Sequence, residues 1–165
     1  MPAALTIRDA RADDAAACAA IYRPHVIESW VSFELDAPDA DEMARRIADY
    51  GASHAWLVAE RAGEVAGYAY GSPHRTRAAY ASSCDVAIYV SAAFLRAGIG
   101  RALYGELLAR LKAKGFHAAF AGIAQPNPAS AALHEACGFT PVGVYREVGW
   151  KLGAWRDVGW WQRLL

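Results

Sequence analysis

The sequence contains few cysteines. Cys18, Cys84 and Cys137 are the three cysteines among its 165 residues, and no two of them stand in a CxxC spacing. An odd number without that spacing predicts neither a disulfide framework nor a structural zinc site, and no histidine spacing suggests metal ligation. We therefore expect no metal cofactor and a reducing compartment, the cytoplasm.

An excess of charge is also missing. The 17 Lys and Arg residues balance the 17 Asp and Glu residues, so nothing global draws the protein to nucleic acid or to an anionic membrane. No basic stripe accompanies the aromatic residues near the C-terminus, which argues against a nucleic-acid-binding module. Any anion site must therefore be local.

Long apolar runs and linkers are absent too. No stretch approaches the roughly 18 apolar residues that cross a bilayer, and the N-terminal stretch acquires charge at Arg8 before any long apolar run. We expect neither membrane insertion nor secretion. No repeat, low-complexity tract or linker divides the chain, and its length suits one core. The prediction is a single domain, residues 1–165.

The sequence does contain a regular succession of strand and helix patterns. Apolar and period-two runs predict strands over 5–10, 55–60, 64–71, 83–90, 116–124, 142–151 and 156–165. Helical spacing predicts helices over 15–22, 39–51, 99–115 and 127–137, with Asp39 as an N-cap and stops at Gly51 and Gly115. These elements indicate one mixed α/β domain.

The junction between the strand 83–90 and the helix 99–115 is rich in glycine. It reads Arg96-Ala-Gly-Ile-Gly-Arg101. Free N–H groups at a helix start and glycines without a Cβ can form a phosphate cradle. The stretch fails the P-loop pattern, and Leu103 occupies the third glycine position of a dinucleotide motif. A tight turn without a ligand stays open as the other interpretation.

The stretch YVSAAFLRAGIGRALY resembles the acyl-CoA pyrophosphate loop of the GNAT-type N-acetyltransferases, whose usual pattern is Gln/Arg-x-x-Gly-x-Gly/Ala. Leu95 departs from it, because Gln or Arg is usual there. Asn127, Ser130, His134 and the following CGF resemble the second signature of the family. The resemblance implies acetyl-CoA as the co-substrate. The residues implied to bind it are Ile88, Tyr89, Val90, Arg96, Ala97, Gly98, Ile99, Gly100, Arg101, Asn127 and Ser130.

Four longer stretches extend the resemblance over almost the whole chain. IYRPHVIESWVSFE, YGSPHRTRAAY, LHEACGF and GWKLGAWRDVGWWQ are similar to the phosphinothricin N-acetyltransferases and the methionine sulfoximine or sulfone acetyltransferases. This implies a GNAT fold with a mixed, mostly antiparallel central sheet flanked by helices. It also implies acetylation of the α-amine of a small amino-acid analogue, and a homodimer to which the apolar VGWWQRLL could contribute.

Acetyl transfer to an amine requires a group that removes the amine proton. By resemblance Asp85, one methylene shorter than the glutamate of the family, and His134 are the catalytic candidates. The residues implied at the substrate are Phe33, Arg75, Arg77, Tyr80 and Val158, with the two arginines suited to a carboxylate. Each has a plainer interpretation, as a solvated strand residue, a packed helix histidine or a basic loop.

Some residues are interpreted structurally. Trp160 and Trp161 are expected in the core or a subunit interface. The four other histidines are expected to be surface or hydrogen-bonded residues: His25, His54, His74 and His117. Two other functions remain open. One is a GNAT enzyme for another amine, such as an ordinary amino acid, a polyamine or a protein N-terminus, and the other is a non-catalytic acyl-CoA sensor.

Overall fold

The computed structural model describes residues 3–165. Its strands and helices follow the expected order, with β6 and β7 as the predicted terminal pair. In chain order the elements are β1 (Leu5–Asp9), α1 (Ala15–Ile27), α2 (Ala40–Ser53), β2 (Trp56–Arg61), β3 (Glu64–Pro73), β4 (Ser83–Val90), α3 (Ile99–Ala113), β5 (Ala118–Ala124), α4 (Pro128–Ala136), β6 (Thr140–Lys151) and β7 (Ala154–Leu164).

Two predicted helix ends are wrong. Helix α1 continues past Tyr22 to Ile27, because Val26 lies one turn on and is buried in the core. Helix α2 continues through Gly51 to Ser53. Gly51 keeps a helical conformation there, since nothing requires the left-handed region that stops a helix at Gly115. The Asp39 N-cap is confirmed, because its side chain accepts a hydrogen bond from the backbone N–H of Glu42 at 2.8 Å.

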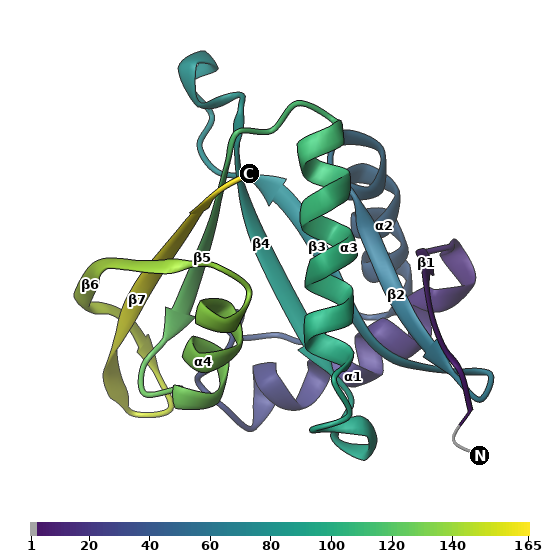
Figure 1. The fold of residues 1–165 in the computed structure, drawn as a ribbon. Coiled ribbons are helices and arrows are strands. Elements are labelled where there is room, and N and C mark those ends of the chain that lie inside the picture. Colours follow the sequence, from purple (N-terminus) through teal and green to yellow (C-terminus); the bar gives the residue numbers. More distant parts are fainter. Residues whose placement is uncertain (1–2) are drawn as a thin grey trace.

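The seven strands form one sheet in the order β1-β2-β3-β4-β5-β7-β6. The pair β4 and β5 is parallel and all the other pairs are antiparallel, which confirms the expected mixed, mostly antiparallel sheet. Helices α1 and α2 lie on one face of the sheet and α3 on the other (Figure 1).

The alternation of side chains along the strands divides the core in two. Trp56 and Val58 of β2 face α1 and α2, whereas Leu57 and Ala59 face α3. This is the period of two that a strand covered on both faces requires. Ile99, Leu103, Leu107 and Leu111 of α3, which recur every four residues in the sequence, are all buried as predicted, and Leu108 is buried beside them. None of the helices within residues 3–165 is long and apolar enough to cross a bilayer.

The strands β4 and β5 separate after a short paired segment. Along these two fully described strands the ladder joins only Ser83–Asp85 to Ala118–Phe120, although β4 remains paired with β3 as far as Val90. Figure 1 shows the two strands diverging below that point. From Val86 onward one edge of β4 therefore faces an opening in the middle of the sheet.

Candidate functional site

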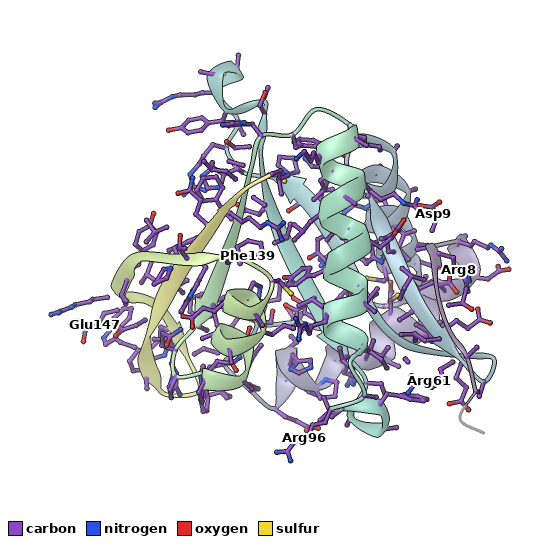
Figure 2. The ribbon with its side chains drawn as sticks, viewed as in Figure 1. Arg8, Asp9, Arg61, Arg96, Phe139 and Glu147 are labelled. Atoms are coloured by element: carbon purple, nitrogen blue, oxygen red, sulfur yellow. The ribbon has the colours of Figure 1, made fainter. Side chains whose placement is uncertain are left out.

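The glycine-rich junction forms a tight turn into α3. Gly98 is the N-cap of the helix with φ +75°, and Arg96 also has a positive φ, of 61°. Gly98 has no side chain to cap the helix start, and uncapped first-turn N–H groups are suited to bind an anion. Arg96 and Arg101 are exposed beside it. Figure 2 shows the Arg96 side chain extending away from the body of the protein at this end of α3.

Gly100 serves a different purpose from Gly98. A Cβ at position 100 would lie 3.0 Å from Cδ2 of Leu133, on α4, whereas one at position 98 would meet nothing within 4 Å. The first glycine therefore allows the left-handed turn, and the second allows α4 to pack against α3. The two sequence interpretations of the junction are compatible, because the same turn leaves the helix N–H groups free.

A narrow cavity of about 60 Å³ lies between β4, β5 and α4. It brings together two groups of predicted residues from distant parts of the chain. Among the residues that line it are Ile88 and Tyr89 of β4, and Asn127, Ser130 and His134 at and on α4. Val90, Arg96 and Arg101 are not in this lining. The side-chain oxygen of Asn127 caps α4 by accepting from the N–H of Ser130 at 3.1 Å.

His134 is buried, with both ring nitrogens engaged. Nδ1 lies 2.7 Å from the carbonyl oxygen of Ser130, and Nε2 lies 2.7 Å from the hydroxyl of Tyr104 on α3. A carbonyl only accepts, so Nδ1 carries a proton and donates it. In the neutral ring, Nε2 then accepts from Tyr104. Burial lowers the pKa of His134, which favours this neutral form.

A larger cavity of about 500 Å³ lies at the point where β4 and β5 separate. Asp85, Phe33 and Val158 line it, together with Glu34 and Trp160. The two cavities meet along the inner edge of β4, because they share lining residues. The shared residues are Val31, Val86, Ala87, Tyr89, Gly122 and Ala124.

Asp85 is the acidic group at this point of the sheet. Its Oδ1 lies 2.5 Å from Nδ1 of His74, the residue that follows β3. Burial raises the pKa of Asp85, and the hydrogen bond from His74 partly offsets that rise. A half-buried carboxylate with a raised pKa is suited to accept a proton from a substrate.

The loop between α1 and α2 forms one wall of the larger cavity. Lys151 of β6 is buried and donates to the carbonyl oxygens of Ser32, at 2.5 Å, and Glu34, at 2.9 Å. Glu34 in turn forms an ion pair with Arg46 on α2 at 2.6 Å. Phe33 packs so closely on Gly149 of β6 that a Cβ there would collide with its ring. The terminal strands thus hold the loop in place.

Arg75, Arg77 and Tyr80 lie on the exposed loop between β3 and β4. They are not among the residues that line the larger cavity. Arg75 donates instead to the carbonyl oxygen of His74 at 2.8 Å. The loop that carries them therefore begins at the residue that contacts Asp85, and their contact with a substrate remains a prediction.

The structure also shows residues that sequence reasoning missed. Trp161 is buried as predicted, and Trp160, which packs against Gly122, also lines the larger cavity, a position that the prediction of core or interface did not include. Within residues 3–165 the buried indole N–H of Trp160 has no hydrogen-bond partner. Tyr104 and His74 were missed because their roles depend on neighbours 30 and 11 positions away. No local motif marks either pairing.

A family model described as an acetyltransferase (GNAT) domain matches residues 7–160. The chain belongs to the GNAT acetyltransferase family. The phosphinothricin N-acetyltransferase of Streptomyces viridochromogenes is 40% identical over 157 residues, covering 95% of this chain and 86% of that protein. The L-methionine sulfoximine/L-methionine sulfone acetyltransferase of Salmonella typhimurium is 33% identical over 162 residues, covering 96% and 93%.

A solved structure agrees with these relatives. The GNAT superfamily phosphinothricin acetyltransferase from Sinorhizobium meliloti, crystallised with AcCoA, superposes with a TM-score of 0.92 at 38% identity, covering 98% of this chain and 88% of that chain. The predicted family, fold class and acyltransferase class are confirmed. In this GNAT domain the separation of β4 from β5 coincides with the two joined cavities, and the turn into α3 follows the end of β4.

Proposed function

We propose that the protein is an acetyl-CoA-dependent N-acetyltransferase that acts on the α-amine of a small amino-acid analogue. Phosphinothricin, methionine sulfoximine and methionine sulfone are the proposed substrates, because relatives that are 40% and 33% identical are named as acetyltransferases of these compounds. The observation that carries the proposal is the 500 Å³ cavity with Asp85 in its wall, joined to the space beneath α3 and α4.

Acetyl-CoA is held along the opening between β4 and β5. The N–H groups of the first turn of α3 bind the pyrophosphate, with Arg96 and Arg101 adding positive charge. Ile88, Tyr89 and Val90 offer the backbone edge that no longer pairs with β5, and it binds the pantetheine and polarises the thioester carbonyl. Asn127 and Ser130, at the start of α4, complete the site. The same set includes Ala97, Gly98, Ile99 and Gly100.

The reaction is a direct attack on the thioester. Asp85 accepts the first proton that the substrate ammonium loses, the nitrogen forms a bond to the acetyl carbon, and the bond from that carbon to sulfur breaks. The second proton of the nitrogen passes to the departing thiolate, which becomes the free thiol. The thiolate leaves on the side of the narrow cavity, where His134 and Tyr104 supply a hydrogen-bonded pair. A covalent enzyme intermediate is not needed.

Recognition of the substrate involves Phe33 and Val158 in the cavity wall. Arg75, Arg77 and Tyr80 form the second part of the proposed recognition set, since guanidinium groups bind carboxylate and phosphinate oxygens. Their support is the position of the loop, which starts beside Asp85. Two cations near the substrate also disfavour a polyamine.

A homodimer is the proposed assembly. VGWWQRLL, the expected contribution to its contact, lies mostly on β7 between β5 and β6, so we place the proposed contact on the edge strand β6 instead. The outer strand of the sheet exposes large apolar side chains, with Val142, Val144 and Trp150 all between 57% and 61% exposed. Such a concentration of apolar surface is typical of an interface. Light scattering at micromolar concentration should give twice the mass of 17.8 kDa, and a monomeric mass would refute the dimer.

The cytoplasm is the proposed compartment. The three cysteines are free thiols, which supports a reducing environment.

The function is tested by following free thiol released from acetyl-CoA. Phosphinothricin, methionine sulfoximine, methionine sulfone, ordinary amino acids, a peptide N-terminus and spermidine are compared side by side. Saturable turnover of the analogues with little turnover of spermidine is expected. Turnover of another amine alone would show that this amine, and not the analogues, is the substrate. Binding of acetyl-CoA without any turnover would indicate the acyl-CoA sensor.

A further inference from the structure

The environment of His74 differs from that of an ordinary surface histidine. Its side chain is only 12% exposed, although it begins an exposed loop. The ring stacks on Phe120 of β5, with centroids 4.4 Å apart and planes 19° apart. Trp160 and Tyr80 meet it edge-on at 6.2 Å and 5.9 Å. Three aromatic rings therefore fix the plane of the imidazole.

That fixed ring directs Nδ1 at Asp85. The distance of 2.5 Å to Oδ1 is shorter than the roughly 2.7–2.9 Å that is usual between a charged nitrogen donor and a carboxylate. The pairing follows from the strand register, since Ser72 of β3 lies opposite Asp85 of β4 and His74 comes two residues later. Within residues 3–165 the side-chain hydrogen bond of Asp85 is made by Oδ1, which leaves Oδ2 available in the cavity that Asp85 lines.

We propose that His74 is a positioning residue for acetyl transfer, which orients the Asp85 carboxylate and stabilises its ionised form. This inference rests on the proposed function, in which Asp85 takes the amine proton. His74 donates from Nδ1 to Oδ1 and leaves Oδ2 to accept the proton from the substrate, directly or through water. No covalent step involves His74, and the first proton that leaves the amine resides on Asp85.

The pairing also accounts for the short side chain at position 85. An aspartate reaches less far than a glutamate and has fewer rotamers, so a partner that fixes one oxygen determines where the other one points.

Other titratable groups lie near Asp85 on each neighbouring element except β5, which contributes the apolar Phe120. They are Arg75 on the loop, Tyr70 on β3, Cys84 and Tyr89 on β4, Tyr22 on α1, and Glu34 across the cavity.

The first experiment measures kcat against pH, with any amine that the wild-type enzyme acetylates. His74→Phe keeps the stacking on Phe120 and removes the N–H donor, whereas His74→Asn keeps a donor. We expect His74→Phe to lower the plateau of kcat by about tenfold and to move its acid limb upward by about one pH unit, because a lost hydrogen bond raises the pKa of the carboxyl. His74→Asn should recover most of both effects. The exposed His117→Phe is the matched control and should change neither.

The second experiment places His74→Phe in an Asp85→Asn background. A positioning role predicts no further loss beyond that of Asp85→Asn alone. An equal loss in both backgrounds, or an unchanged acid limb in His74→Phe, would overturn the proposal.

The third experiment needs no substrate. A ¹³C NMR titration of the Asp85 carboxyl in the ligand-free protein should show a pKa about one unit higher in His74→Phe than in the wild type. An unchanged titration refutes the pairing. If the wild type acetylates none of the amines, the proposed function fails, and this titration still decides whether His74 controls Asp85.

Discussion

The hydroxyl of Tyr104 lies 2.7 Å from Nε2 of His134, deep between α3 and α4. Both groups line the narrow cavity, whereas Asp85 lines the larger one. The two catalytic candidates are therefore separated along β4. In the proposed mechanism Asp85 therefore acts on the incoming amine, and the pair of His134 and Tyr104 lies on the side of the departing thiolate.

Removal of the Tyr104 hydroxyl tests that pairing. In Tyr104→Phe the buried Nε2 of His134 loses its partner, which should cost about 1–3 kcal/mol of unfolding free energy. The fall in kcat should be roughly tenfold or more, because the narrow cavity loses the hydroxyl that is paired with His134. Urea unfolding and steady-state kinetics measure the two effects. Tyr145→Phe, exposed on β6, is the control and should stay within about 0.5 kcal/mol of the wild type.

Replacement of Asp85 by Asn should separate chemistry from binding. We expect turnover to fall by roughly 100-fold or more, with the Kd for acetyl-CoA changed less than about twofold, because Asp85 lies in the amine-side cavity. Thiol release and calorimetric titration give the two values. Asp13→Asn, on an exposed turn before α1, is the control. Unchanged turnover in Asp85→Asn would remove this residue from the mechanism.

The pH dependence follows from the direction of the pKa shift at Asp85. A base must be ionised, so kcat/KM should fall as the pH drops through the pKa of this carboxyl, which burial raises. The same shift has the opposite effect on stability. A raised folded-state pKa means that the contribution of Asp85 to stability is lost as the pH rises through that pKa. We therefore expect Asp85→Asn to match or exceed the wild-type Tm at pH 8 while it loses the acid limb of kcat/KM.

The contact between Gly149 and Phe33 gives a test of whether Phe33, in the wall of the larger cavity, contacts the substrate. In Gly149→Ala the new methyl group would displace the Phe33 ring, so the KM for the amine should rise severalfold while the KM for acetyl-CoA stays constant. Gly143→Ala on the same strand meets nothing within 4 Å and serves as the control. An equal change in both KM values would show that β6 affects the whole site.

The two glycines of α3 form a second matched pair. Gly100→Ala places a methyl group 3.0 Å from Leu133 and should displace α4, weakening acetyl-CoA binding severalfold and lowering stability. Gly105→Ala in the same helix meets nothing within 4 Å and should stabilise the protein by about 0.5–1 kcal/mol through helix propensity. Chemical unfolding and acetyl-CoA titration compare the two variants. Intact binding in Gly100→Ala would show that the close packing is dispensable.

Much of the fold could be predicted from local patterns. The strand 83–90 and the helix beginning at residue 99 were located correctly, because a buried strand and an amphipathic helix impose periods of 2 and 3.6 on the apolar residues. The end of α1 was not predictable in this way. It depends on the burial of Val26 by α2 and the sheet, which is a tertiary contact.

The sequence by itself determined the glycine turn at residues 96–101, because it depends on residue types at fixed short spacings. It also determined the family, and the resemblance to that family implied the candidate groups Asp85 and His134. The tertiary structure alone decided what those groups touch. His74 meets Asp85 through the register of β3 and β4, Tyr104 meets His134 through the packing of α3 on α4, and Lys151 fixes the cavity wall from 117 positions away. Such contacts depend on how distant segments pack, and periodicity within one segment carries no information about its neighbours in space.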